Sequence, residues 1–597
     1  MSTLSYSGPA TLSANQLFHA TLTVALDEPI QAGGSIVLAA RHVSDLADAQ
    51  DREPQAEGYV RVRCSRDGAK LRLSSENVWA RHPWNRGFQL TAGGRLERGD
   101  KVIVELGGAR GFRCQSFCEE AFRFRLGVQP GPDEPFRVTP VDELPGIRVT
   151  GNAAQRVRLR VCEPNSRTTR RRICIKLEDG YGNPTDLEEA ELDLLLEGGQ
   201  PIRTARITGA AELLDVPVPW DDSWHRLTAS SLDGRFHAVS NPFGPSLVRD
   251  HFLYWGEIHS QSGLCDGTGS PGELYRYARR AAGLDFASVT SHDMLLSPED
   301  WAEVQRRTRE ANEPGRFVTL LGYEWSGGTE RGGDSNIYYL GDRGPLVYNG
   351  AFIAPELLSV WGDWSDGTRH AAARCRTLAE TIKEIRASEV PFLVIPHCGG
   401  RAANLDFHDP AVMPVFEVHS CHRNYQDIAD QAIQRGLHFG FIGGSDDHRG
   451  MPGDSVPAAR ERFFSSRAGL AGVYARELTR EALWEALYAR RVFATNGCRM
   501  ALVFRAGGAL MGGEISAATG SAIRLEFEAV LDGYFDHAEI VEDDEVIARF
   551  SRNENQILRY ADGMMATVRR GAAQYYVRVF QTDGGIAWAS PVRVTGV

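Results

Sequence analysis

Histidine, aspartate and glutamate side chains recur at the ends of apolar segments in the middle third of the chain. Ten of the sixteen histidines lie between residues 251 and 450. Neutral imidazoles and carboxylates are ligands that suit Zn²⁺, Mn²⁺ and Fe²⁺ in proteins. Water held by such an ion becomes hydroxide near neutral pH, so a cluster of these residues can drive hydrolysis. The candidate metal ligands are His259, Gln261, Asp266, His292, Glu324, Asp334, His397, Asp446 and His448.

The spacing of these residues indicates how they could meet. His259 and Gln261 are two positions apart, as are Asp446 and His448. Alternate residues of a strand point to the same face, so each pair can present two side chains to one site. The other candidates stand mostly where an apolar run ends, and α/β domains build their sites at the ends of parallel strands.

The segments around the candidate ligands alternate between short apolar strands and helices. Ser270-Pro271 followed by Glu273 predicts a capped helix that stops at Gly283, and Ser297-Pro298 opens a second helix in the same way. The predicted strands include DFASVT (285–290), RFVTLLGYEW (316–325), PFLVIPH (391–397), VFEVHS (415–420) and FGFIGGSDDH (439–448). Strand–helix alternation over about 200 residues predicts a parallel α/β domain, either an open sheet or a barrel.

The rest of the chain has the pattern of β-structure. Stretches such as KVIVEL (101–106) and AELDLLL (190–196) alternate apolar and polar residues, which is the period of a half-buried strand. QPGPDEPF (129–136) and NPFGP (241–245) have the composition of linkers. We expect four domains: a β-sandwich (1–130), an immunoglobulin-like β domain (131–248), the central α/β domain (249–499) and a C-terminal β domain (500–597).

Composition restricts the classes of partner. The net charge is −12, whereas a nucleic-acid-binding surface needs a basic excess. No run of eighteen apolar residues occurs, and the N-terminus lacks the basic and apolar regions of a signal peptide. The ten cysteines are scattered, which fits reduced thiols better than a disulfide framework. We expect a cytoplasmic protein that acts on a small molecule, without a nucleic-acid or membrane partner; the oligomeric state stays open.

Six motifs of the central segment resemble those of the PHP domain, the polymerase-and-histidinol-phosphatase superfamily of metallohydrolases. In family order they are HSQSG (259–263), CDG (265–267), TSHD (290–293), LLGYE (320–324), VIPH (394–397) and GGSDDH (443–448). The match covers roughly residues 250–460. Residues 472–497, followed by ALMGGEI (509–515), resemble a large, poorly characterised PHP subfamily with extra β domains.

The resemblance implies a distorted (β/α)7 barrel flanked by N-terminal and C-terminal β-sandwich domains, with the site at the carboxyl ends of the barrel strands. It implies two divalent ions, Zn²⁺, Mn²⁺ or Fe²⁺, with a third position also available. The implied ligand sets are His259, Glu324 and Asp446 for the first position, Glu324 and His397 for the second, and Asp266, His292 and His448 for the third. Glu257 would orient a ligand histidine without itself binding the ion.

Three residues depart from the pattern of this superfamily. Gln261 replaces the second histidine of an HxH motif, and a neutral amide is a poorer ligand for these metals. Ser291 replaces the aspartate of a TDH motif, and Asp334 stands where related proteins often have histidine. Either Asp334 serves the second position or one position is empty.

The function that the resemblance implies is a metal-dependent hydrolase, in which a metal-bound hydroxide attacks the substrate. Phosphoester hydrolysis is favoured because it is the commonest activity of the superfamily. Hydrolysis of a carbamate or carboxylic ester on the same site is one alternative, and a catalytically degenerate barrel that acts as a binding protein is another. His448, His422 or Asp447 could move protons, and Arg401 and Arg423 could contact an anionic group of the substrate.

Overall fold

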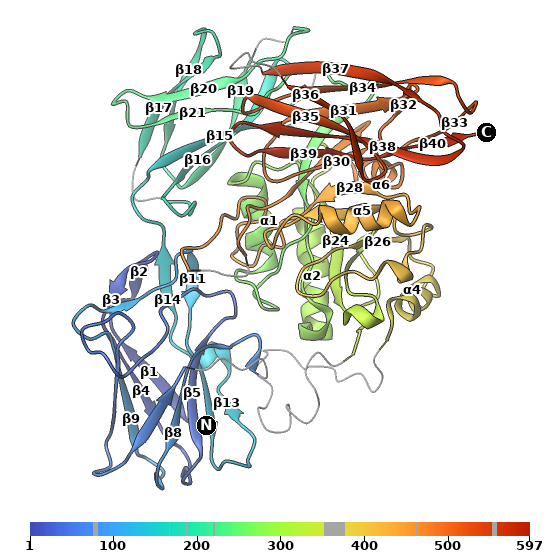
Figure 1. Ribbon diagram of the computed structural model, residues 1–597. Helices are drawn as coiled ribbons and strands as arrows, with labels where there is room; N and C mark the ends of the chain where they lie inside the picture. Colours follow the sequence, from blue (N-terminus) through green and yellow to red (C-terminus); the bar gives the residue numbers. More distant parts are fainter. Residues whose placement is uncertain are drawn as a thin grey trace.

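The computed structural model describes residues 1–75, 81–165, 168–185, 189–218, 221–350, 376–460, 464–551 and 558–597. Within these ranges the chain forms five α-helices and forty strands (Figure 1). The helices are α1 (Pro271–Arg280), α2 (Pro298–Ala311), α4 (Leu378–Arg386), α5 (Gln426–Gln434) and α6 (Arg480–Tyr488). None of these described helices has the length and hydrophobicity that crossing a bilayer requires.

Residues 1–150, here called the N-terminal unit, pack two antiparallel sheets around one core that includes Leu22, Leu38 and Val104. Buried residues alternate along 20–25 and 101–106 because one face of each of these strands meets the other sheet, whereas every residue of 35–40 is buried. The first sheet is β1 (Thr3–Ser7), β4 (Ala20–Ala25), β9 (Lys101–Leu106) and β6 (Val60–Cys64), and the second is β13 (Arg137–Val138), β12 (Arg125–Gln129), β5 (Ser35–Ala40), β8 (Arg86–Ala92) and β7 (Leu71–Ser74). β14 (Ile147–Thr150) pairs with β2 (Thr11–Ser13), so the pairing of this unit continues beyond residue 130.

Residues 156–239 form a second unit of two antiparallel sheets. Its core includes Val161, Ile175 and Leu192. One sheet is β15 (Arg156–Val161), β16 (Arg170–Glu178) and β19 (Ala211–Pro217), and the other is β18 (Pro201–Ile207), β17 (Ala190–Leu196), β20 (Leu227–Ser231) and β21 (His237–Val239).

A thirteen-stranded sheet carries the candidate site. Its strands β22 (Phe252–Glu257), β23 (Phe286–Val289) and β24 (Val318–Ser326) run parallel, whereas β25 (Asp334–Tyr339) and β26 (Phe392–Pro396) continue it in antiparallel pairing. α1 returns the chain from β22 to β23, and its capping box between Ser270 and Glu273 confirms the predicted helix start. β27 (Val415–His419) and β28 (Gly440–Gly443) form a separate parallel pair.

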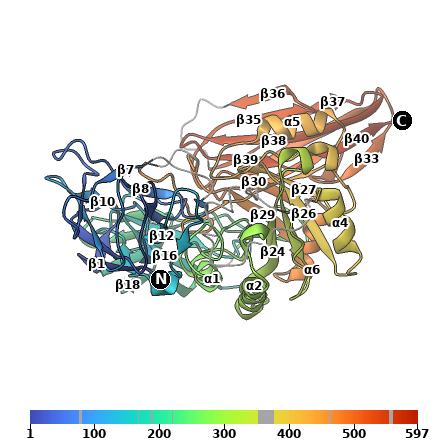
Figure 2. The same ribbon diagram turned by 90° about the horizontal axis from the view of Figure 1, so that it is seen from below.

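The same sheet continues into the C-terminal strands. From β22 it passes through β29 (Leu470–Ala475) and β30 (Val492–Thr495) to β39 (Ile586–Ala589), β38 (Gly571–Gln581), β35 (Phe535–Glu542) and β36 (Glu545–Ser551), with β40 (Val592–Gly596) and β33 (Glu514–Ala517) beside β38. A second sheet contains β32 (Ala509–Leu510), β31 (Ala501–Ala506), β34 (Ala522–Val530) and β37 (Arg559–Thr567). Trp255 of β22 and Val577 of β38 share one hydrophobic core. The C-terminal strands and the N-terminal unit lie at opposite ends of the molecule in both views (Figure 1 and Figure 2).

The expected (β/α)7, TIM-like barrel flanked by β-sandwich domains is wrong. The described chain is mainly β, its central sheet mixes parallel and antiparallel pairs, and that sheet runs without a break into the C-terminal strands. Apolar strand segments predict burial but not direction. The link from β24 to β25 spans only residues 327–333, which is too short for the crossover that a parallel strand needs, so β25 returns antiparallel.

Candidate metal centre

The candidate ligands converge at the carboxyl ends of β22, β23 and β24. His259 follows β22, His292 follows β23, and Glu324 lies near the end of β24. Because these strands are parallel, their carboxyl ends meet at one edge of the sheet. An isolated bridge between Ser260 and Asp447 brings the last predicted motif to the same edge. The predicted ligands His259, Gln261, Asp266, His292, Glu324, Asp334, His397, Asp446 and His448 are all buried, with at most 7% of each residue exposed.

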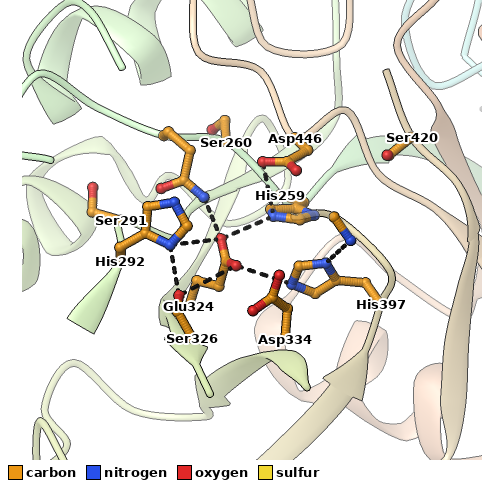
Figure 3. Close-up of polar contacts among 12 residues, drawn as sticks. His259, Ser260, Ser291, His292, Glu324, Ser326, Asp334, His397, Ser420 and Asp446 are labelled. Carbon is orange, nitrogen blue, oxygen red and sulfur yellow. Dashed lines mark hydrogen bonds and ion pairs between the residues drawn. The ribbon is translucent and has the colours of Figure 1, made fainter. Parts of the chain in front are cut away.

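The ligand atoms fall into groups whose members lie within 4.8 Å of one another. The first group is His259, Glu324 and Asp446, the second is Glu324, Asp334 and His397, and the third is Asp266, His292 and His448. Figure 3 shows Glu324 between His259, His292 and His397. Glu324 therefore links the first and second groups.

Separations within the groups suit a shared ion better than direct hydrogen bonds. Nε2 of His259 lies 3.2 Å from Oδ1 of Asp446 and 3.4 Å from Oε2 of Glu324. In the third group, Nε2 of each histidine is 3.5 Å from an oxygen of Asp266. A charge-assisted hydrogen bond would measure about 2.7–2.9 Å. Two ligands that are each about 2.1 Å from a tetrahedral ion lie about 3.4 Å apart, which matches these separations.

Three buried ligand atoms have no hydrogen-bond partner among the described residues. They are Oδ1 of Asp266, Nε2 of His397 and Oδ1 of Asp446, one in each group. A buried polar atom without a partner costs free energy, so such atoms are rare and need a physical explanation. A divalent cation in each group would satisfy them, and a set of imidazoles and carboxylates fits Zn²⁺, Mn²⁺ or Fe²⁺.

Contacts at the far ring nitrogen orient two of the ligand histidines. Nδ1 of His259 lies 3.1 and 3.0 Å from the two carboxylate oxygens of Glu417, and Nδ1 of His448 lies 2.8 Å from the backbone oxygen of Asp446. Both contacts place the ring proton on Nδ1 and leave Nε2 for an ion. His259 in the first group and His448 in the third thus present Nε2 to the neighbouring ligand oxygens.

Glu417 is a residue of the candidate centre that the sequence prediction did not include. It lies in β27, where every residue is buried, and it also offers a ligand atom within 4.8 Å of His259 and His397. A buried carboxylate needs a partner, so a glutamate in the middle of the apolar run VFEVHS was a usable signal.

The second group is shaped differently. Nδ1 of His397 accepts a 3.2 Å hydrogen bond from the amide of Gly399, which places the ring proton on Nε2. Asp334 is held by Arg401, whose Nε donates to Oδ1 and whose backbone amide donates to Oδ2 at 2.9 Å. An ion here would have to displace the Nε2 proton and compete with a guanidinium. The first and third groups are therefore the better-formed positions.

Two of the departures from the family pattern place neutral hydrogen-bonding groups at the centre. Nε2 of Gln261 donates to Oε2 of Glu324, and Oε1 accepts from the thiol of Cys265 at 3.2 Å. Oγ of Ser291 lies 2.8 Å from Oγ of Ser262. Gln261 thus points its donor, not its acceptor, at the central carboxylate.

The predicted proton-transfer residues have different surroundings. Nε2 of His422 lies 2.9 Å from Oδ2 of Asp446, and its side chain is 18% exposed. The carboxylate of Asp447 instead accepts hydrogen bonds from Ser455 and from two backbone amides of the turn that follows it. His422 can reach both solvent and the centre, whereas Asp447 shapes the turn.

The two arginines that were predicted to contact an anion also differ. Nη2 of Arg401 lies 3.9 Å from Oε1 of Glu324, so the structure brings this residue to the centre. Arg423 pairs with Asp427 at 2.9 Å, and its guanidinium lies over the ring of Tyr425. The structure does not bring Arg423 to the candidate ligands.

Charge and burial shift the pKa values of the ligands in opposite directions. Burial, together with the neighbouring His259, lowers the pKa of His397 to about 3. Burial also opposes protonation of His292, but the carboxylates of Glu324 and Asp266 raise its pKa to about 9. Burial alone would raise the pKa of Asp266, yet the two adjacent histidines hold it well below its usual value. Without an ion, the ring of His292 is therefore protonated and positively charged at neutral pH, whereas the ring of His397 is neutral.

The backbone near Asp446 has a conformation that few residues adopt. Its φ is 51°, in the left-handed region, which aspartate tolerates better than most side chains. Glu257 supports this turn, because its carboxylate accepts hydrogen bonds from the amides of His259 and, at 2.9 Å, Ser445. Glu257 therefore acts on the backbone of the ligand histidine and not on its ring.

Similarity to solved structures is slight. Fibronectin(III)-like modules of Clostridium thermocellum CbhA match 16% of this chain and 96% of their own, with a TM-score of 0.13 and 14% identity. A beta-glucuronidase of Parabacteroides merdae matches 98% of this chain and 79% of its own, with a TM-score of 0.16 and 8% identity. Neither TM-score is high enough to compare folds.

Similarity at the level of sequence is broader. The family model described as "Protein of unknown function (DUF3604)" matches residues 456–524. An uncharacterized protein of Chlamydia muridarum is 22% identical over 573 residues, which covers 87% of each chain. An uncharacterized protein of Chlamydia pneumoniae is 23% identical over 565 residues, which covers 85% of each chain. The chain is thus similar over most of its length to proteins whose activity is undescribed.

Proposed function

We propose that this chain is a metal-dependent hydrolase and that its favoured substrate class is the phosphoester. The observation that carries the proposal is the set of 3.2–3.5 Å ligand separations around buried atoms that lack partners. Charge-assisted hydrogen bonds would be shorter, at about 2.7–2.9 Å, and an ion in each group would give these buried atoms a partner. The resemblance of six motifs to metallohydrolase motifs supports the same reading.

The chain's own residues would hold two divalent ions, Zn²⁺, Mn²⁺ or Fe²⁺. The ligand sets are His259, Glu324 and Asp446 for one ion, and Asp266, His292 and His448 for the other. Such ions supply Lewis acidity and lower the pKa of coordinated water. Glu417 and the backbone oxygen of Asp446 hold the histidine rings in place, so that the ligands need not reorganise on binding. The group around His397 offers a third position.

Two partly exposed residues supply the remaining chemistry. His422 lies 2.9 Å from Asp446 and is open to solvent, so it can pass a proton between the centre and water. Arg401, whose side chain is 21% exposed beside Glu324, carries a cationic guanidinium that suits an anionic group. A phosphoester brings such a group to the site, whereas a neutral carbamate or carboxylic ester does not.

Binding without catalysis is the second candidate function, and Gln261 favours it. Its amide donates to Glu324, the carboxylate shared by two groups, and so occupies an oxygen that an ion would use. A chain with this role would keep the buried centre but would not turn over substrate.

Metal analysis combined with a substrate panel tests the proposal. The full chain is stripped with a chelator, reloaded with Zn²⁺ or Mn²⁺ and assayed with aryl phosphomonoesters, phosphodiesters, carboxylic esters and carbamates. We expect bound ions and metal-dependent turnover of a phosphoester. Turnover of an ester or carbamate alone would move the activity to that bond class, and bound metal without turnover would favour the binding protein. A folded chain that takes up no ion would overturn the proposal.

A matched pair of variants links the result to the centre. His292→Ala removes a ligand of the third group, whereas His19→Ala removes an exposed imidazole of the N-terminal unit. We expect lower metal content and activity in the first variant alone. Equal loss in both would show that the effect is not specific to the centre.

A further inference from the structure

Two side chains of the N-terminal unit reach the loop that carries Asp266. Nε2 of His82 lies 3.1 Å from Oδ2 of Asp266, and the two side chains are 3% and 4% exposed. The guanidinium of Arg41 donates to the backbone oxygens of Gly263 and Cys265, each at 2.8 Å. The N-terminal unit therefore holds both the backbone of this loop and its carboxylate, although about 180 residues separate His82 from Asp266 in the chain.

The two oxygens of Asp266 have different surroundings. Oδ2 lies 3.1 Å from Nε2 of His82 and 3.5 Å from Nε2 of His292, whereas Oδ1 is buried without a hydrogen-bond partner among the described residues and lies 3.5 Å from Nε2 of His448. A donor on one oxygen fixes the plane of the carboxylate and leaves the other oxygen for an ion. His82 thus stands where it can aim Oδ1 at the third group.

Packing within the N-terminal unit holds His82 in position. Its ring contacts the ring of His42, with centroids 5.2 Å apart, and Nδ1 of His42 lies 3.2 Å from Oδ1 of Asn85. The guanidinium carbon of Arg41 lies 4.6 Å from the centroid of the Trp84 ring. Residues Trp84 and Asn85, which follow His82, are therefore tied to the same unit as Arg41, and the contact with Asp266 is part of a packed interface.

We propose that His82 is a positioning residue of the metal centre, and that the N-terminal unit is a required part of the site formed by Asp266, His292 and His448. This inference rests on the proposed metal-dependent function. His82 donates Nε2–H to Oδ2 of Asp266 and does not itself bind the ion. The centre is consequently shared between two units that are distant in the sequence, and the N-terminal unit contributes directly to metal affinity.

Equilibrium dialysis of the stripped full chain against Zn²⁺, with metal content as the readout, tests this role. His82→Ala removes the donor, His82→Gln restores an N–H donor in a similar volume, Asp266→Ala removes the ligand, and His19→Ala is the control in the same unit. We expect His19→Ala to bind two ions with the same affinities as wild type. Asp266→Ala should lose the ion of the third group. His82→Ala should weaken that one ion by about 10–100-fold, and His82→Gln should recover part of the loss.

The outcomes separate this inference from the proposed function. Two ions bound with wild-type affinity in His82→Ala would overturn the role of His82 while leaving the metal centre in place. Equal weakening of both ions, or no rescue by His82→Gln when circular dichroism shows a folded chain, would also overturn it, because a merely structural residue has no preference for one position. No ion in wild type would overturn both.

Discussion

Nδ1 of His259 and Oε2 of Glu417 lie 3.0 Å apart in the interior of the protein. This contact joins the end of β22 to β27, which belong to different sheets. The carboxylate fixes the imidazole ring and makes Nε2 a better ligand, so Glu417 can strengthen the first metal position without touching the ion.

Glu417→Gln should weaken metal binding at the first position by about 10-fold, because the amide keeps the volume but loses the charge that polarises His259. Zn²⁺ titration of the stripped protein measures the effect. Glu545→Gln, at an exposed position of β36, is the matched control. Unchanged affinity in Glu417→Gln would assign this residue to packing alone.

Metal binding at the third position should release protons. His292 has its pKa raised to about 9, so at neutral pH an incoming ion must displace a proton from this ring. Affinity should therefore increase as the pH rises from about 7 towards about 9. Calorimetry in two buffers of different ionisation enthalpy measures the number of protons released, and His292→Ala should lower that number.

The same pKa shift predicts how the metal-free fold responds to pH. The pKa is raised on folding, so protonated His292 stabilises the fold fully below its ordinary pKa of about 6.5, and this contribution is lost as the pH rises through about 9. In thermal melting of the stripped protein, the midpoint should fall as the pH rises across this range. The fall should be smaller in His292→Ala. A midpoint that is flat in wild type would contradict the assigned charge state.

Local signals in the sequence predicted the parts of the site that local chemistry determines. The capping boxes at Ser270 and Ser297 are confirmed as helix starts. The ends of apolar runs were used to place His292 and Glu324, and the structure does bring these residues together. Caps and buried runs depend on a few neighbouring residues, which is why they can be read along the chain.

Strand direction and long-range contacts could not be read in the same way. An apolar run such as RFVTLLGYEW is buried whether its neighbour is parallel or antiparallel, so the mixed sheet left no local signature. The contact between His82 and Asp266 joins segments that no motif connects. Glu417 lay within a predicted strand, but its partner was set by packing between two sheets.

Gln261→His should create an additional metal ligand. The glutamine amide now donates to Glu324, and an imidazole at this position would replace that donor with a nitrogen that can bind an ion. We expect a higher ion content, or tighter binding at the positions that share Glu324, measured by metal analysis after reloading. Gln261→Met is the control, because the methionine side chain has a length similar to that of glutamine but offers neither a hydrogen-bond donor nor a hard ligand. Equal ion content in both variants would show that position 261 does not face the metal positions.

Lys176→Met should destabilise the second β unit and its junction with the turn that follows His448. Lys176 is fully buried, lies 2.9 Å from Glu178 and pairs with Asp454 of that turn. Breaking a buried pair by removing one partner costs about 3–5 kcal/mol, because the remaining charges stay buried. Arg160 still holds Asp454, so the expected loss is at the lower end of that range, about 3 kcal/mol. Calorimetric melting of the full chain should show a lower midpoint, whereas Lys101→Met, at an exposed end of β9, should leave it unchanged. Equal midpoints in the two variants would mean that Arg160 alone ties the second unit to the turn that follows His448.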